Sequence, residues 1–384
     1  MKEIYFDNSA TTNVDKEVAE VVYEAMLNNY GNPSSHHHKG LTAEKLLTEA
    51  RRDIAKTLGV EETNIIFTAG GTESDNMAIT GIANAYKKIG NHIITTAVEH
   101  PAVLKTVKAL SENGFKVTVL PVDRSGKINL DDLASAIKPE TILVSVMAVN
   151  NETGTIEPLA DIGRLLNAQK QRIFFHVDAV QAYGKIPIAL QSCNIDLLSA
   201  SGHKIHAPKG VGFLYIAKGV RIVPLVHGGG QENNLRSGTE NVPGILGFAK
   251  AAKAAYNECN NRYNQVEMVK KTFLVELGAK VSGWHINSPK DALPYVLNIR
   301  FNGIKSEVLL HALETKGLYV SSGSACAARK DSLSHVLTAL GLSREEIEGS
   351  IRFSFSYHNT AEEAVEAACI VVDTVNELRK ILSD

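Results

Sequence analysis

The 384-residue sequence lacks the features that mark several large classes of protein. Its four cysteines are far apart and form no CxxC pair: Cys193, Cys259, Cys326 and Cys369. This spacing does not fit the common zinc motifs, and a disulfide framework is not expected in so long a chain. No hydrophobic run approaches about 18 residues, so no membrane span is expected. The first residues lack the apolar core of a signal peptide, and we expect a reducing, cytoplasmic compartment.

The sequence also has little excess charge. It contains 40 Lys and Arg residues against 42 Asp and Glu residues, which gives a formal net charge of -2. A nearly neutral chain lacks the basic surface that nucleic-acid binding requires, so no direct nucleic-acid partner is expected. What is present is 44% hydrophobic and 21% charged residues, typical of a packed globular protein. The length indicates two lobes rather than one core.

Strand-like and helix-like segments alternate between residues 65 and 216. Seven strands are predicted, at 65–67, 92–95, 115–120, 142–148, 173–177, 197–198 and 211–216. This alternation predicts an α/β fold with a mostly parallel, seven-stranded sheet and helices on both faces.

From about residue 243 the pattern becomes long and helical, as expected for a connector between lobes. The strands and helices beyond it predict a smaller α+β domain, with capping-box patterns beginning at Ser343 and Thr360. We therefore predict a large domain at 15–257 and a small domain that combines 1–14 with 258–384.

One lysine stands at a tight turn between two of the predicted strands, in the sequence Ser201-Gly202-His203-Lys204. A lysine held at a desolvated strand end has a lowered pKa and can act as a nucleophile. The other interpretation is a surface turn with an ordinary solvated amine. This stretch alone favours neither.

Two more motifs stand at predicted strand ends. Gly71-Thr72 follows a strand and opens a helix, where free backbone N–H groups can bind phosphate. Asp178 ends another apolar strand, and a buried carboxylate there needs a cationic partner such as a protonated ring nitrogen. Each motif alone also fits a plain polar loop. Together with the amine of Lys204 they specify pyridoxal phosphate, with Lys204 as the Schiff-base lysine and Asp178 at the ring nitrogen.

Three consecutive histidines, His36-His37-His38, could suggest a metal site. Neighbouring positions do not share one helix face. We therefore expect a loop or a helix start near a polar pocket, and no metal site.

The chain resembles the fold-type I pyridoxal-phosphate enzymes of the class-V aminotransferase family, and within them the cysteine desulfurases of the iron–sulfur type. The resemblance covers nearly the whole chain. The motifs that carry it are Asp7-Asn8-Ser9-Ala10-Thr11-Thr12, Gly31-Asn32-Pro33-Ser34-Ser35, Gly71-Thr72-Glu73-Ser74-Asp75-Asn76, Glu99-His100, Asn150-Asn151-Glu152-Thr153-Gly154, His176-Val177-Asp178-Ala179-Val180-Gln181, Ser201-Gly202-His203-Lys204, Gly228-Gly229-Gly230-Gln231-Glu232, Arg236-Ser237-Gly238-Thr239 and Ser321-Ser322-Gly323-Ser324-Ala325-Cys326.

The resemblance implies roles for the matching positions. His100 would stack on the cofactor ring and help to move protons. Arg352 would bind the substrate carboxylate as a bidentate pair. Thr239 would reach the phosphate from a second subunit, which implies a homodimer. The remaining positions would surround the ring and the substrate (Gln181 and Asn151) or contact the phosphate (Gly71, Thr72, Ser201 and His203).

Cys326 lies among small residues, in a segment expected to be mobile and accessible, and Arg329 and Lys330 would favour its thiolate. Without the family it could be an incidental loop cysteine. The resemblance implies that it takes the sulfur of L-cysteine, leaves L-alanine and carries a persulfide to an acceptor. An iron–sulfur scaffold and a transfer-RNA thiolation enzyme are both candidate acceptors. The length of the stretch 323–341 resembles that of the mobile-loop subgroup.

Three other functions stay open at this stage. A selenocysteine lyase or an aminotransferase would also use Lys204, although an aminotransferase does not need Cys326. A non-catalytic sulfur-trafficking or scaffold protein could retain the fold alone, and the presence of Lys204 argues against it.

Overall fold

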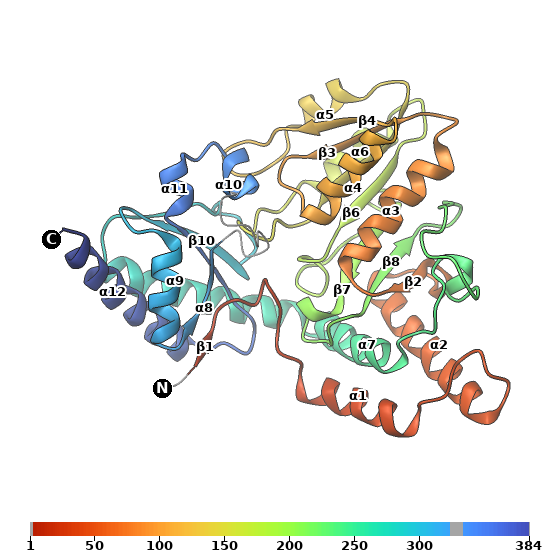
Figure 1. The fold of residues 1–384 in the computed structure, drawn as a ribbon, viewed down its shortest axis with the longest axis horizontal. Helices are drawn as coiled ribbons and strands as arrows, with labels where there is room; N and C mark the ends of the chain where they lie inside the picture. The colour runs from red at the N-terminus through yellow and green to blue at the C-terminus, as the bar shows by residue number, and fades with distance from the viewer. Residues whose placement is uncertain (1–2, 323–332, 384) are drawn as a thin grey trace.

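The computed structural model describes residues 3–322 and 333–383 (Figure 1). Its largest sheet has seven strands in the order β2-β8-β7-β6-β5-β3-β4. They are β2 (Ile65–Thr68), β3 (His92–Thr96), β4 (Lys116–Leu120), β5 (Thr141–Met147), β6 (Phe174–Asp178), β7 (Leu197–Ser201) and β8 (Gly212–Ile216). Only β8 runs antiparallel to its two neighbours in this sheet, whereas the other pairs are parallel. The predicted sheet is confirmed.

Helices cover both faces of this sheet, as the sequence predicts. On one face, α3 (Gly71–Tyr86) and α4 (Pro101–Glu112) pack on inward-facing strand residues such as Ile93 and Leu143. The opposite face is covered by α2 (His38–Leu58), α5 (Leu130–Ala136), α6 (Leu159–Asn167) and α7 (Val242–Asn257), and α1 (Lys16–Asn28) packs on α7. Because successive strand residues point to opposite faces, one strand supplies both cores.

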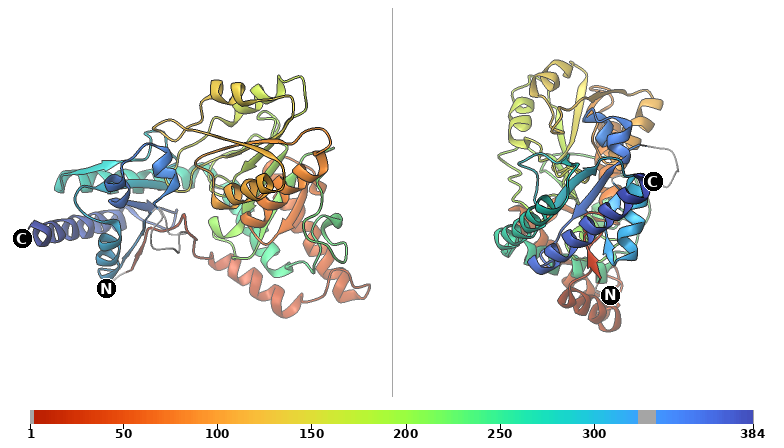
Figure 2. Two further views of the ribbon diagram at one scale, coloured as in Figure 1. Left: turned by 45° about the horizontal axis from the view of Figure 1, so that its top comes forward. Right: turned by 90° about the vertical axis from the view of Figure 1, so that its left-hand side faces the viewer.

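A second unit lies beside the large sheet (Figure 2). Its sheet has the strand order β12-β13-β10-β9 and is antiparallel. The strands are β9 (Trp284–Ile286), β10 (Val296–Phe301), β12 (Ser321–Ser322) and β13 (Ser350–Ser354), and β1 (Ile4–Tyr5) pairs separately with β11 (Leu318–Tyr319). The helices are α8 (Cys259–Lys280), α9 (Ser306–Thr315), α10 (His335–Ala339), α11 (Arg344–Glu348) and α12 (Ala361–Ser383).

Both capping boxes predicted from the sequence form. Ser343 accepts a hydrogen bond from the Glu346 N–H, and Thr360 accepts one from the Glu363 N–H. In return, each glutamate carboxylate accepts the backbone N–H of its capping residue. None of the described helices combines the length and the hydropathy needed to cross a bilayer.

The predicted helical connector is two helices, because the chain breaks between α7 and α8 at Glu258, where φ is -108° and ψ is 9°. Phe248 of α7 packs in the large unit, against Tyr183 and Phe213. Phe273 of α8 packs in the small unit against Phe6 and Phe353, and residues of both helices belong to one continuous hydrophobic core. The break coincides with the expected domain boundary between 257 and 258, and the domain division itself stays a prediction.

Candidate active site

The candidate site lies at one edge of the large sheet, where the six parallel strands end. Because β8 alone is reversed, β2, β3, β4, β5, β6 and β7 all direct their carboxyl ends toward the same edge. Ligands of open α/β sheets bind at such an edge. The sequence-predicted residues follow these strand ends: Gly71 and Thr72 after β2, His100 after β3, Asn151 after β5, Asp178 and Gln181 at β6, and Ser201, His203 and Lys204 at β7.

The amine of Lys204 is held by the N-terminal segment of the chain. Lys204 ends a short 3-10 turn, Gly202–Lys204, and its Nζ donates to the carbonyl oxygens of Ser9 at 2.5 Å and Ala10 at 2.8 Å. Thr12 fixes the same turn, because its backbone N–H and its hydroxyl both donate to the His203 carbonyl at 3.0 Å. The interpretation of a solvated surface lysine is therefore wrong.

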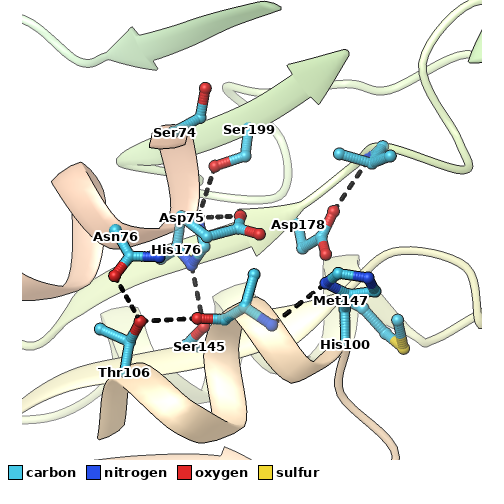
Figure 3. A network of polar contacts seen from close by, with 12 residues as sticks. Ser74, Asp75, Asn76, His100, Thr106, Ser145, Met147, His176, Asp178 and Ser199 are labelled. Atoms are coloured by element: carbon cyan, nitrogen blue, oxygen red, sulfur yellow. Dashed lines mark hydrogen bonds and ion pairs between the residues drawn. The ribbon is translucent and has the colours of Figure 1, made fainter. Parts of the chain in front are cut away.

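Asp178 and His100 are two neighbouring titratable side chains at this edge. The Asp178 side chain is buried, with 4% exposed, and its Oδ1 accepts the Val180 N–H at 2.9 Å. Burial raises the pKa of Asp178, while the nearby His100 and Lys204 act in the opposite direction. Figure 3 shows the His100 imidazole beside this carboxylate.

The His100 ring is held in one orientation. It caps the start of α4, where its Nδ1 accepts the Ala102 N–H at 3.1 Å. Burial lowers the pKa of His100; Asp178 opposes this, and Lys204 and His335 lower the pKa further. A neutral imidazole whose Nδ1 accepts carries its proton on Nε2, so Nε2 is the donor.

The start of α3 has the form of an anion cradle. Gly70 has a φ of 147°, and no side chain among the described residues caps this helix. A Cβ on Gly71 would lie 2.5 Å from Cγ2 of Val180, so the backbone requires glycine there. Thr72 is exposed at the opening, and Ser201 lies beside Gly70. An uncapped helix start with adjacent hydroxyls fits a phosphate group.

His203 stands next to this cradle. Its Nδ1 lies 3.2 Å from the Thr11 hydroxyl. Burial and the Lys204 amine lower the pKa of His203 to about 4. At neutral pH it is therefore an uncharged hydrogen-bonding side chain.

A buried polar cluster lies behind Asp178, and the sequence reasoning did not find it (Figure 3). His176 on β6 is fully buried and contacts the hydroxyls of Ser145 at 2.8 Å and Ser199 at 3.0 Å. Burial lowers the pKa of His176 to about 3 and raises the pKa of Asp75, whose carboxylate lies 3.5 Å from the His176 ring. The apolar periodicity of α3, through Ile79, would have placed Asp75 on the buried face.

Arg352 reaches the site edge from the small unit. It lies on β13, is 4% exposed, and donates to Asp7 Oδ1 at 2.9 Å and to the Asn151 carbonyl at 3.0 Å. Its Nε is buried without a hydrogen-bond partner among the described residues. A buried guanidinium N–H in this state fits a further carboxylate. Asp7, the ion-pair partner, was not identified from the sequence as a site residue.

Two predicted residues are not placed among these contacts, and one of them falls outside the part of the chain that the structure describes. Thr239 is exposed, on a segment that the Arg236–Glu73 ion pair (2.7 Å) ties to the start of α3. Cys326 lies outside the described residues. Of the three consecutive histidines, His37 caps α2 by accepting the Gly40 N–H at 3.3 Å, so of the two expected alternatives, a loop or a helix start, the structure has the helix start.

A further cluster of potential metal ligands, Asp15, His206 and His358, lies behind the lysine turn, with its ligand atoms within 4.8 Å of one another. Asp15 does not cap α1 with its side chain; it accepts hydrogen bonds from Tyr357 at 2.5 Å and from His358 at 2.6 Å. His206 Nδ1 lies 2.9 Å from the Asn13 carbonyl. These groups satisfy one another, so we assign no metal to them.

Known proteins of one family match nearly the whole length of this chain, both in sequence and in structure. A family model described as aminotransferase class-V matches residues 4–367. Cysteine desulfurase IscS of Methanosarcina thermophila is 47% identical over 381 residues, which cover 99% of this chain and 94% of that protein. Putative cysteine desulfurase IscS 1 of Bacillus subtilis (strain 168) is 45% identical over 380 residues, covering 98% of this chain and 100% of that protein. The solved structure of a NifS-like protein matches with a TM-score of 0.91 at 42% identity, covering 97% of this chain and 99% of the other.

Proposed function

The chain belongs to the class-V aminotransferase family and is a pyridoxal-phosphate-dependent cysteine desulfurase, and on that premise we propose which of its residues carry the activity. The observation that carries the proposal is the Lys204 amine, which the Ser9 and Ala10 carbonyls hold near His100 and Asp178, where its charge lowers the pKa of both side chains. An amine nucleophile, an imidazole and a buried carboxyl at one sheet edge match the needs of amino-acid chemistry on this cofactor.

The residues of the edge fit the cofactor. The start of α3, with Gly71, Thr72 and Ser201, would hold the phosphate. Asp178 would pair with the protonated ring nitrogen, which would give its buried carboxylate a direct ion pair, a contact that it makes with no side chain among the described residues. Gln181 would lie near the ring hydroxyl. When bound, pyridoxal phosphate supplies an electron sink for the substrate carbon.

The substrate, L-cysteine, would bind between the two units. Arg352 offers its buried Nε to the substrate carboxylate while Asp7 and the Asn151 carbonyl hold the rest of the guanidinium. The Lys204 amine and the His100 Nε2 then move protons to and from the substrate carbon and its amine. His203 and Thr239 complete the contacts to the phosphate.

We assign the sulfur transfer to Cys326. Its thiolate attacks the sulfur of the substrate, a sulfur–sulfur bond forms, and the carbon–sulfur bond of the substrate breaks. The substrate carbon then takes a proton, so that L-alanine leaves and a persulfide remains on Cys326. Arg329 and Lys330 follow it in the sequence by three and four residues, and we propose that their charges favour the thiolate form.

An incubation with L-cysteine tests this assignment directly. We expect equimolar alanine and protein-bound sulfur, with added sulfur on the Cys326 peptide in mass spectrometry. Cys326→Ala should abolish both, while Cys369→Ala, which alters a half-buried cysteine of α12, should retain both. Alanine released from cysteine at the normal rate by Cys326→Ala would contradict the mechanism.

The persulfide sulfur passes to an acceptor protein, for which we propose an iron–sulfur scaffold or a transfer-RNA thiolation enzyme. We further propose a homodimer in the cytoplasm. The names of the similar proteins, cysteine desulfurase IscS, support a sulfur-donor role. Transfer of ³⁵S from the loaded enzyme to each purified acceptor distinguishes the two candidates, since only the true acceptor should receive label at a rate that exceeds release of free sulfide.

A further inference from the structure

A second buried lysine lies close to the proposed site and has no part in the function given above. Lys185 follows β6 and is 5% exposed, and its Nζ lies 5.4 Å from the centre of the Tyr295 ring. The backbone beneath it is tightly fitted: Gly184 has a φ of 74°, and a Cβ there would lie 3.0 Å from Cγ2 of Ile205. Lysine is rarely buried unless its amine has a specific partner.

The partner of this amine is the side chain of Gln181. Lys185 Nζ donates to Gln181 Oε1 at 2.9 Å, and Gln181 Nε2 donates to the Ser9 carbonyl at 3.0 Å. The same carbonyl accepts the Lys204 amine at 2.5 Å. A continuous chain of three hydrogen bonds therefore joins the two lysines through one amide and one carbonyl.

We propose that Lys185 is a positioning residue for Lys204, acting through Gln181 and the Ser9 carbonyl. Because the Lys185 Nζ donates here, the Gln181 Oε1 must face Lys185 and the Gln181 Nε2 must face Ser9. The N–H end then points at the carbonyl that holds Lys204. This inference rests on the proposed function, because it takes Lys204 as the reacting amine.

Two further observations agree with this role. Burial, together with the positive charges of Lys204 and Arg352, lowers the pKa of Lys185 to about 7. The Lys185 amine also lies over the ring of Tyr295, in the segment that enters β10. The amine that holds the Gln181 amide is therefore itself in contact with the small unit. Replacing Lys185 by an apolar side chain leaves the buried Gln181 oxygen without its donor, which frees the amide to turn.

The experiment is a double-mutant cycle on the enzyme loaded with pyridoxal phosphate. It uses Lys185→Met, Gln181→Leu and the combination of both. The readout is the pH midpoint of the visible absorbance of the lysine-bound cofactor, together with kcat and KM for L-cysteine. Lys270→Met is the matched control: Lys270 is also desolvated, with its pKa lowered to about 8, but donates to the Val296 carbonyl in the small unit.

We expect Lys185→Met to shift the midpoint by about one pH unit, in the same direction as Gln181→Leu, with a fall in kcat. The double variant should shift no further than the larger single change. Lys270→Met should keep the midpoint of the unaltered enzyme. Lys185→Gln, which keeps a shorter N–H donor, replaces the Met variant if thermal unfolding shows that Met does not fold.

Two outcomes overturn the inference. In the first, Lys185→Met has the same absorbance midpoint as Lys270→Met, although Gln181→Leu still shifts the midpoint. The other is an additive double variant, which would mean that Lys185 acts independently of Gln181. An enzyme whose visible band is unaffected by Lys204→Ala contradicts the proposed function itself, so the two failures are distinguishable.

Discussion

Asp178 is the residue on which the cofactor assignment can be tested most simply. Its carboxyl is buried at the end of β6, and His100 and Lys204 favour its charged form against the effect of burial. Asp178→Asn keeps the shape and removes the charge. We expect the rate of alanine formation to fall by about 10²–10³-fold, as for other charge-stabilising groups in active sites.

The stability of Asp178→Asn serves as its own control. Because the substitution removes a desolvated carboxyl, the free energy of unfolding should be unchanged or higher than that of the unaltered protein. Alanine formation at the normal rate by a folded Asp178→Asn enzyme would rule out the proposed pairing with the ring nitrogen.

Glu157, a buried carboxyl outside the candidate site, makes the stability of the protein depend on pH. It is 4% exposed, its Oε2 accepts the Ile128 N–H at 3.1 Å, and its Oε1 has no partner among the described residues. Burial raises the pKa of Glu157 from 4.5 to about 7. The folded protein therefore binds this proton more tightly than the unfolded chain, so the contribution to stability is complete below pH 4.5 and is lost as pH rises through 7.

Glu157→Gln removes this titration. The difference in unfolding free energy, variant minus unaltered protein, should increase by up to about 3 kcal/mol between pH 5 and pH 8, as measured by urea unfolding. Glu140→Gln, which alters a carboxylate that pairs with Lys116 at the surface, is the control. A difference for Glu157→Gln that is equal at both pH values would contradict the assigned pKa.

Individual site residues differ in how far the sequence could reveal them. Parallel strands bring their carboxyl ends together, so the motifs at Lys204 and Asp178 could be assigned to one edge from the pattern alone. Lys185 could not be assigned to the site in this way, because in the sequence a lysine four residues after Gln181 cannot be told from a solvated surface residue. Its burial arises from packing against Tyr295, a contact between segments more than a hundred residues apart.

Among the helices and strands, local signals predicted the capped helix starts, but one short strand of the small unit was missed. The capping box at Thr360 is a purely local pattern, and it forms as expected. The strand β9 is only three residues long, and it forms where β10 lies beside it. Such pairing depends on the tertiary fold and leaves no periodic trace in the sequence.

Thr360→Ala tests how much the start of α12 contributes to the whole protein. Loss of a capping hydroxyl costs about 1 kcal/mol, and α12 packs along α8, so we expect a fall of that size in the free energy of unfolding. Thr360→Ser, which keeps the hydroxyl, should restore most of it. A Ser variant as unstable as Ala would mean that the methyl group of Thr360, and not its cap, provides the stability.

In the whole molecule, an N-terminal segment meets both the lysine turn and a segment that precedes the last helix. Residues 9–13 hold Lys204 and His206, while Tyr357 and His358 hold Asp15. The site is therefore assembled from segments that the sequence separates by more than 300 residues. The family resemblance could name Arg352 as a site residue, but only the fold reveals that Asp7 is its partner.

The proposed homodimer can be tested by mixing two defective enzymes. If Thr239 serves the site of the other subunit, a Lys204→Ala chain can lend its intact Thr239 to a Thr239→Ala chain. Each mixed dimer then contains one complete site. Lys204→Ala dimers should be inactive and Thr239→Ala dimers impaired.

After unfolding and refolding an equal mixture, we expect about a quarter of the normal activity above the Thr239→Ala background, because half of the dimers are mixed and each has one complete site. If Thr239 instead serves its own chain, which the Arg236–Glu73 ion pair beside α3 would allow, every site in the mixture lacks one group. The mixture would then show no gain over its separate components. Sedimentation of each variant, measured first, ensures that both form dimers.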